Sequence, residues 1–198
     1  MYSALIAAVV LAYTWLLAPV TPRWTATAAA MVVAVLAVIA AARRGEWGLA
    51  RRAFLPALGA SAVFTAAAAA AIAIYGWRLG TWHARSTLAA DAVLLVPWAL
   101  GQQFALQVVF LRDAQAITSR GAGILVASAA FAALHLPNPF LAAATFVAAL
   151  AWSAIYDRAP NVVPLALSHA LLTLVVLLAL SDDVTGRLRV GAAYLDLH

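Results

Sequence analysis

Residues 161–180 read NVVPLALSHALLTLVVLLAL, an apolar stretch without a charged side chain that carries one histidine, His169, near its middle. A helix rises about 1.5 Å per residue, so a stretch of about 20 residues crosses the roughly 30 Å of hydrocarbon in a bilayer. Helix is the default conformation in lipid because each backbone amide is then satisfied inside its own segment. The stretch therefore predicts a transmembrane helix with an imidazole at mid-membrane depth.

Similar apolar stretches recur along the whole chain. Of its 198 residues, 67% are hydrophobic and only 10% are charged, a composition outside the range of soluble domains. Apolar segments lie at about 2–20, 24–42, 53–76, 88–111, 121–137, 139–156 and 161–180. We therefore predict an all-α fold, a polytopic transmembrane helical bundle of about seven spans.

The pattern of segments divides the chain into three parts. Residues 1–87 carry N-terminal transmembrane helices, residues 88–180 form a core of helices in the C-terminal half, and residues 181–198 form a polar tail. The N-terminal stretch lacks a basic start and a cleavage site, so it is read as a retained span. Because every basic residue is an arginine and alanine is abundant, we expect a bacterial, multi-pass protein of the inner (cytoplasmic) membrane.

The distribution of charge sets the expected orientation and excludes some partners. Arg43, Arg44, Arg51 and Arg52 form the most basic loop, and basic loops stay on the cytoplasmic side of a membrane. The other arginines stand singly or as near neighbours between spans, without a clustered basic face, so we expect no nucleic acid as a partner. The absence of cysteine excludes disulfides and thiolate metal ligands.

Polar side chains inside the later spans are the candidates for function. Gln102, Gln103 and Gln107 lie in one span, and the last two, four residues apart, share a helix face. Such amides often serve to join helices by hydrogen bonds, each worth on the order of 1 kcal/mol. Ionisable groups in spans are functional hypotheses by default. Since His135 and His169 lie on two further predicted spans, we predict that they share a polar chamber with the glutamines.

Two stretches in this region resemble motifs of a known family. Phe131-Ala-Ala-Leu-His135, followed by a Leu-Pro-Asn-Pro sequence, resembles the FxxxH motif of the CAAX protease and bacteriocin-processing (CPBP, or Abi) family of intramembrane proteases. Further on, the stretch from Tyr156 to His169 resembles the family's final histidine motif. The resemblance covers roughly residues 95–180, and it implies a CPBP-like core in the C-terminal half of the bundle.

The chain departs from the family at several polar positions. The family's EExxxR motif is replaced by Gln102, Gln103 and Gln107, and Thr173 stands where the final motif has asparagine or aspartate. By the resemblance, the catalytic positions are His135, His169, Gln102 and Gln103, and the substrate or oxyanion positions are Gln107, Thr173, Phe131 and Asn138. Both histidines are thus kept, while the charged members of the motifs are lost.

The loss of the glutamates bears directly on catalysis. In the family, a glutamate and a histidine activate water for attack on a peptide bond, and a histidine with asparagine stabilises the oxyanion. A general base must accept a proton, which a glutamine amide does not do near neutral pH. The only glutamate of this chain, Glu46, lies in a loop, and Asp91 lies about 16 Å along the helix from Gln102. The sequence offers no carboxylate in their place.

Neither a metal nor another cofactor is expected. His135 and His169 supply two nitrogen ligands without a nearby carboxylate, whereas catalytic zinc sites use three protein ligands. The other two histidines, His83 in a loop and His198 at the end of the chain, are expected to be solvated. The predicted chemistry therefore belongs to side chains alone.

Three kinds of function remain open. The first is an intramembrane endopeptidase that processes a membrane-anchored peptide or a C-terminal signal peptide. The second is a catalytically inactive pseudo-protease that binds a transmembrane or lipidated peptide, or that partners an active paralogous protease. The third, a small transporter or channel, is disfavoured because the chain has no internal repeat and no pair of broken helices near the midplane. In each case the lipid bilayer is the surrounding partner.

Overall fold

The computed structural model describes residues 2–22 and 24–196, so the predicted solvation of His198 lies outside the described residues. These residues form one helical bundle, and the predicted all-α fold is confirmed. Its helices are α1 (Tyr2–Leu11), the π-helix η1 (Ala12–Leu17), α2 (Trp24–Arg44), the 3₁₀-helix η2 (Arg51–Ala53), α3 (Phe54–Leu79), α4 (Leu88–Phe104), the π-helix η3 (Ala105–Leu111), α5 (Arg112–Ile117), α6 (Arg120–Ala133), α7 (Pro139–Arg158) and α8 (Val162–Ala179). Within the described ranges, β-pairing is limited to one bridge between Leu49 and Asn161.

The observed helices match the predicted spans closely. Within the described residues, five helical segments are long and apolar enough to cross a membrane: Trp24–Arg44, Arg51–Leu79, Leu88–Ile117, Pro139–Arg158 and Val162–Ala179. Two shorter apolar helices, Tyr2–Leu17 and Arg120–Ala133, correspond to the first and fifth predicted segments. The chain is therefore an integral, multi-pass membrane protein. Helix α6, which corresponds to the fifth predicted segment, ends at Ala133. His135 therefore lies in the turn after α6 and not inside a span.

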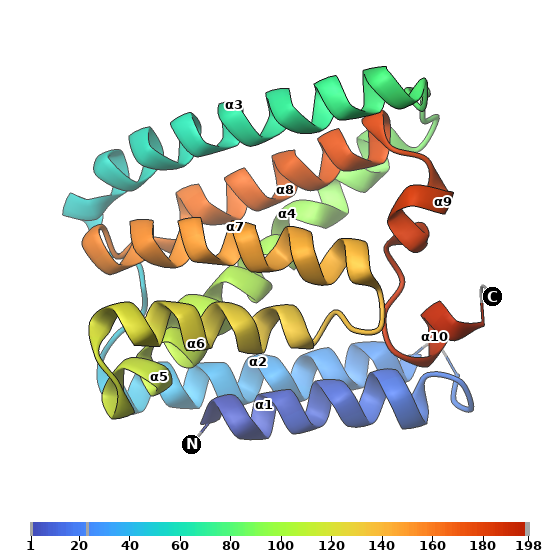
Figure 1. Ribbon diagram of the computed structural model, residues 1–198. Helices are drawn as coiled ribbons and strands as arrows, with labels where there is room; N and C mark the ends of the chain where they lie inside the picture. The colour runs from blue at the N-terminus through green and yellow to red at the C-terminus, as the bar shows by residue number, and fades with distance from the viewer. Residues whose placement is uncertain (1, 23, 197–198) are drawn as a thin grey trace.

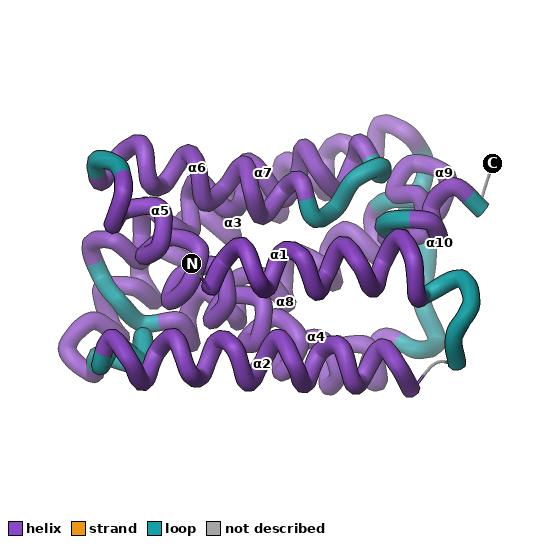
Figure 2. The backbone as a smooth tube through the Cα atoms, turned by 90° about the horizontal axis from the view of Figure 1, so that it is seen from below, coloured by secondary structure: helices purple, strands orange, loops and turns teal. Residues whose placement is uncertain are grey.

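The helices run side by side between two ends of the bundle (Figure 1). Helix α3 packs along α8, α8 packs along α4, and α6 and α7 form an antiparallel pair. Helices α1 and α2 lie on the side of the bundle away from α3, as the view from below also shows (Figure 2). The start of the chain and the basic end of α2 lie at one end of the bundle, and the C-terminal tail lies at the other.

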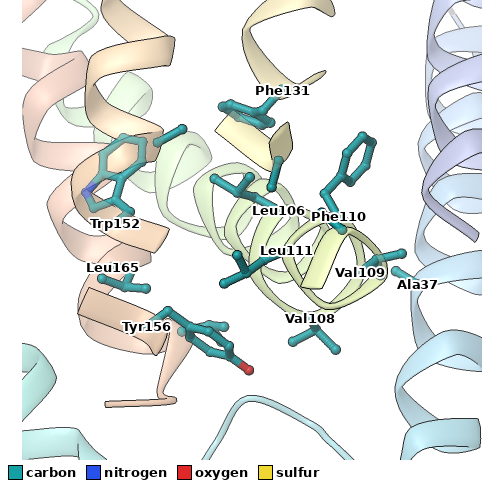
Figure 3. Packing of buried hydrophobic residues seen from close by; sticks show 14 of the residues in the cluster. Ala37, Leu106, Val108, Val109, Phe110, Leu111, Phe131, Trp152, Tyr156 and Leu165 are labelled. Atoms are coloured by element: carbon teal, nitrogen blue, oxygen red, sulfur yellow. The ribbon is translucent and has the colours of Figure 1, made fainter. Parts of the chain in front are cut away.

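The core of the bundle is centred on the π-helix η3. Every residue of η3 is buried, including Leu106, Val108, Val109 and Phe110. Figure 3 shows how side chains from α2, α6, α7 and α8 surround this segment. Because lipid tails are as apolar as leucine, helices in a bilayer associate through close packing and polar contacts and not through the hydrophobic effect. The continuous helix from α4 to α5 is therefore the element against which α1, α2, α6, α7 and α8 pack.

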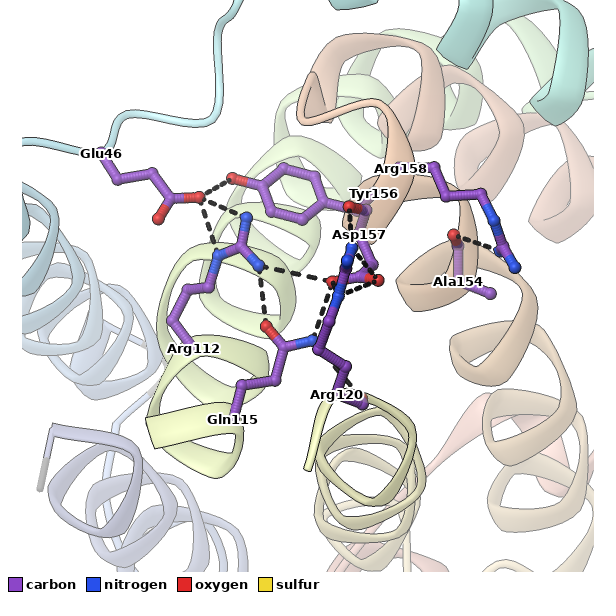
Figure 4. A network of polar contacts seen from close by, with 8 residues as sticks. All are labelled: Glu46, Arg112, Gln115, Arg120, Ala154, Tyr156, Asp157 and Arg158. Carbon is purple, nitrogen blue, oxygen red and sulfur yellow. Dashed lines mark hydrogen bonds and ion pairs between the residues drawn. The ribbon is translucent and has the colours of Figure 1, made fainter. Parts of the chain in front are cut away.

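A polar network joins the loop and helix ends at the basic end of the bundle (Figure 4). Arg112 donates from Nε to Glu46 Oε1 over 2.8 Å and from Nη1 to Gln115 Oε1 over 2.7 Å. Gln115 Nε2 donates to Asp157 Oδ1 over 2.9 Å, and Arg120 pairs with the same carboxylate over 2.7 Å. These contacts connect the α2–α3 loop, α5, α6 and α7, so charged groups fix the bundle where water can reach them.

The tail beyond α8 folds back on the opposite end of the bundle. It forms α9 (Asp182–Thr185), the 3₁₀-helix η4 (Gly186–Leu188) and α10 (Ala192–Leu195). Asn138, which caps α7 by accepting from Leu141 N, donates its amide to the carbonyls of Thr185 and Arg189 over 2.9 and 3.0 Å. The tail is therefore anchored to the α6–α7 turn, which the polarity of residues 181–198 alone did not predict.

The packing of α3 on α8 yields a test of the bundle. A Cβ at Gly76 would collide with the backbone of Ala179, whereas a Cβ at Gly59 on the same helix would meet nothing within 4 Å. We expect Gly76→Ala to lower the free energy of unfolding by about 1–3 kcal/mol, because backbone cannot move aside cheaply. Gly59→Ala should leave it unchanged or raise it by up to about 1 kcal/mol through helix propensity. Unfolding in mixed micelles measures both, and equal stabilities would contradict the close approach.

Candidate functional site

Two glutamines of the central helix form a hydrogen-bonded line to the histidine of α8. Gln107 Nε2 donates to Gln103 Oε1 over 3.1 Å, and Gln103 Nε2 lies 3.4 Å from His169 Nδ1. Both glutamine side chains are fully buried. Because the Gln103 amide nitrogen is a donor, this arrangement makes Nδ1 the acceptor and places the proton of a neutral imidazole on Nε2. Of the three glutamines predicted to meet the histidines, Gln103 contacts His169 directly and Gln107 is connected to it through Gln103.

His135 approaches the same region from the turn after α6. Its Nδ1 lies 2.8 Å from the Phe131 carbonyl oxygen, and the two rings are edge to face with centroids 4.9 Å apart. Since a carbonyl can only accept, the Nδ1 atom of His135 carries the proton and Nε2 carries the lone pair. The imidazoles of His135 and His169 are close enough to interact electrostatically. The Nε2 atom of His169 is thus a hydrogen-bond donor, and the Nε2 atom of His135 is an acceptor.

Neither Nε2 atom has a hydrogen-bonding partner among residues 2–22 and 24–196. Gln102, half-buried beside the line, also makes no hydrogen bond within these ranges. The side-chain oxygen of Gln107, Oε1, also has no hydrogen-bonding partner in the described chain. The site therefore retains free donors and acceptors, and the one on fully buried Gln107 is costly unless something binds it.

Other residues implied by the family resemblance have their polar groups occupied elsewhere. Both polar atoms of Asn138 are used in capping α7 and anchoring the tail. The Thr173 hydroxyl donates to the His169 carbonyl one helical turn before it, over 3.0 Å. Phe131 is buried and contacts the site through the ring of His135. The structure thus joins Gln103, Gln107 and His169 by hydrogen bonds, with His135 close by. Asn138 and Thr173 make their hydrogen bonds to backbone atoms instead.

In the described part of the chain, no carboxylate contacts the side chains of this site. Glu46 is bound at the basic end of the bundle, where its Oε1 accepts from Arg112 and from the Tyr156 hydroxyl over 3.1 Å. Among the residues that the structure describes, no group of three or more histidine, aspartate or glutamate side chains is placed to hold a metal ion. The polar groups gathered between α4 and α8 are accordingly amides, hydroxyls and imidazoles.

Sequence reasoning missed two groups of residues around this site. Trp152 stacks on His169, and Ser168 accepts from the indole nitrogen; Ser168 could have been noticed only through its position beside His169. Arg44 donates from Nη1 to the Val108 carbonyl over 2.7 Å and also pairs with Asp113. The π-helix that carries Gln107 is therefore held from α2, a contact for which the sequence carries no signal.

Comparison with known proteins supports the family resemblance. Residues 86–175 match the family model described as Type II CAAX prenyl endopeptidase Rce1-like. This range begins just before α4 and ends within α8, and it contains every glutamine and histidine of the site. No curated protein and no solved structure matches the chain.

The glutamine line can be tested by a matched pair of substitutions. Gln103→Leu removes the acceptor of the Gln107 amide and leaves that amide buried, which should lower the free energy of unfolding by about 1–3 kcal/mol. Gln102→Leu, one residue away and without a hydrogen bond in the described chain, should cost less than about 0.5 kcal/mol. Unfolding titrations in mixed micelles compare the two, and a larger loss for Gln102→Leu would contradict the arrangement.

Proposed function

We propose, from the match of residues 86–175 to the Rce1-like model of type II CAAX prenyl endopeptidases, that the protein binds a membrane-anchored peptide without hydrolysing it. The polar site between α4 and α8 would receive the peptide in the hydrocarbon region. The proposed setting is the inner membrane of a bacterium, where an active paralogous protease would perform any cleavage. In this account the chain is a pseudo-protease.

The observation that carries the proposal is the hydrogen-bonded Gln103 amide between Gln107 and His169. A glutamate at position 103 would supply a carboxylate beside the imidazole, but the amide does not take up a proton near neutral pH. General-base catalysis typically contributes about 100-fold to 10,000-fold to a reaction rate. Without it, a peptide bond at this site has no efficient route to hydrolysis.

The paired change at positions 103 and 107 supports the same conclusion. The family motif has a glutamate and an arginine there, and this chain has two glutamines that hydrogen-bond to each other. A buried ion pair carries a large desolvation penalty, which a neutral pair of similar shape avoids. Replacing both partners therefore keeps the contact between turns of the helix while it removes the charges needed for chemistry.

The remaining groups suit recognition of a peptide backbone. In their neutral forms, His169 offers an N–H donor at Nε2 and His135 offers a lone pair at Nε2. A peptide group presents one carbonyl acceptor and one N–H donor, and in lipid both need partners. An unwound stretch of a transmembrane or lipidated peptide, or of a C-terminal signal peptide, would satisfy the two imidazoles and gain the partners that it lacks in hydrocarbon.

A second candidate function is slow proteolysis with histidine as the base. The unpaired Nε2 lone pair of His135 favours it, because an imidazole can accept a proton from water. In this mechanism His169 would donate from Nε2 to the carbonyl oxygen under attack. The amides of Gln102 and Gln103 would then position the substrate.

The two functions differ in a cleavage and binding assay. We expect the natural protein in nanodiscs to bind fluorescently labelled membrane-anchored peptides without cutting them, and His169→Ala to weaken binding about tenfold, the equivalent of one lost hydrogen bond. A Gln102→Glu/Gln103→Glu/Gln107→Arg variant, which restores the family motif, should acquire cleavage. Mass spectrometry of the peptides detects cleavage, and fluorescence anisotropy measures the dissociation constant.

The control for this assay is His83→Ala, which changes an exposed histidine outside the site and should leave binding unchanged. Cleavage by the natural protein that His135→Ala abolishes would overturn the proposal and establish the protease. Absence of binding to every membrane-anchored peptide tested, while the protein in nanodiscs remains folded, would also count against it.

A further inference from the structure

The imidazole of His169 lies against an aromatic ring from another helix. Trp152 of α7 stacks on it with ring centroids 4.7 Å apart and an interplanar angle of 26°. The indole is 2% exposed, so it has almost no freedom to leave this position without moving its neighbours. The contact of His169 with Gln103 is long, at 3.4 Å, and touches only the Nδ1 edge. The stack therefore constrains the plane of the imidazole, which the amide alone does not.

The indole is itself held by hydrogen bonds that end on α3. Trp152 Nε1 donates to Ser168 Oγ over 3.0 Å, inside the protein. Thr65 Oγ1 lies 2.6 Å from that same serine oxygen and 2.6 Å from the Ser61 carbonyl oxygen of its own helix. An indole N–H is a donor only, so Ser168 satisfies the one polar group of Trp152. Thr65 then fixes Ser168 against α3.

A second residue of α3 touches the indole directly. The ring of Phe64 meets Trp152 edge to face, with centroids 6.1 Å apart and an interplanar angle of 82°. Phe64 and Thr65 both lie outside residues 86–175, the part of the chain that matches the family model. Helix α3 thus contacts Trp152 at its ring and, through Ser168, at its nitrogen.

We propose that Thr65 and Phe64 of α3 hold the indole of Trp152, and that Trp152 acts as a positioning residue that sets the orientation of the His169 imidazole. The inference goes beyond the proposed function, because a fixed imidazole serves recognition and hydrolysis alike. A site of this kind needs its groups held within about 0.5 Å and 10–20° of the working geometry by their neighbours. A helix outside the family segment supplies that support here.

The test must observe the His169 ring, because a loss of stability alone would follow from any disturbed packing. We would record ¹H–¹³C spectra of histidine-labelled protein in nanodiscs, with His169 assigned through His169→Gln. The indole ring current displaces the imidazole C–H resonances, and Trp152→Leu defines the positions without it. Thr65→Val removes the hydroxyl at nearly constant volume, Thr65→Ser restores it, and Thr145→Val is the control.

Thr145 is a suitable control because its hydroxyl contacts only carbonyls of its own helix, α7, at Leu141 and Ala142. We expect Thr65→Val to move the His169 resonances most of the way toward their Trp152→Leu positions, Thr65→Ser to bring them back, and Thr145→Val to leave them unchanged. If Thr65→Val does not fold, Ser168→Ala removes the same link and should produce the same displacement.

Two results would overturn the inference. If Trp152→Leu leaves the His169 resonances in place, the indole does not stack on the imidazole. If Trp152→Leu moves them but Thr65→Val, or Ser168→Ala in its place, leaves them at their natural positions, the hydrogen bonds from Thr65 through Ser168 do not hold the indole, as the inference requires. Neither result depends on peptide binding, so a failure here is distinguishable from a failure of the proposed function.

Discussion

A polar side chain inside a bilayer must find its partner within the protein, and in this bundle that constraint acts most strongly on Gln103. Its amide is fully buried and is used at both ends, by Gln107 on the central helix and by His169 on α8. Water is not available at that depth to replace a lost contact. The line of three side chains therefore joins α4 to α8 in addition to the packed alanines Ala99, Ala166 and Ala170. Together with the stacked indole, it limits the orientation of the His169 imidazole.

The rest of the fold separates charge from this neutral centre. Glu46, Arg112 and Asp157 form their network at one end of the bundle, where the ends of several helices meet. The π-helix between α4 and α5 packs all its side chains inward, and Arg44 holds one of its carbonyls. π-helical segments of this kind are rare and frequently occur at functional sites. Here the π-helix includes Gln107, which donates a hydrogen bond to Gln103.

The sequence predicted the parts of this structure that depend on local pattern. Apolar runs of membrane length marked the helices, and the spacing of Gln103 and Gln107 placed them on one face, because both follow from the helical repeat. Contacts between distant segments had no such signal: Thr65 reaches Ser168, and the tail returns to Asn138. The position of His135 was predicted less well: the predicted span ran to residue 137, whereas α6 ends at Ala133 and leaves His135 in the following turn. Whether the site binds a peptide or hydrolyses it depends on the chemistry of its side chains, which the helical periodicity of the sequence does not predict.

The central claim, that Gln103 and His169 meet inside the bundle, is tested most directly by a double-mutant cycle. The free energies of unfolding of the natural protein, Gln103→Leu, His169→Leu and the double variant would be measured in mixed micelles. A direct contact predicts that the two substitutions are coupled by about 0.5–1.5 kcal/mol, the range found for hydrogen bonds between membrane helices. Additivity within about 0.3 kcal/mol, the behaviour of independent sites, would contradict the account.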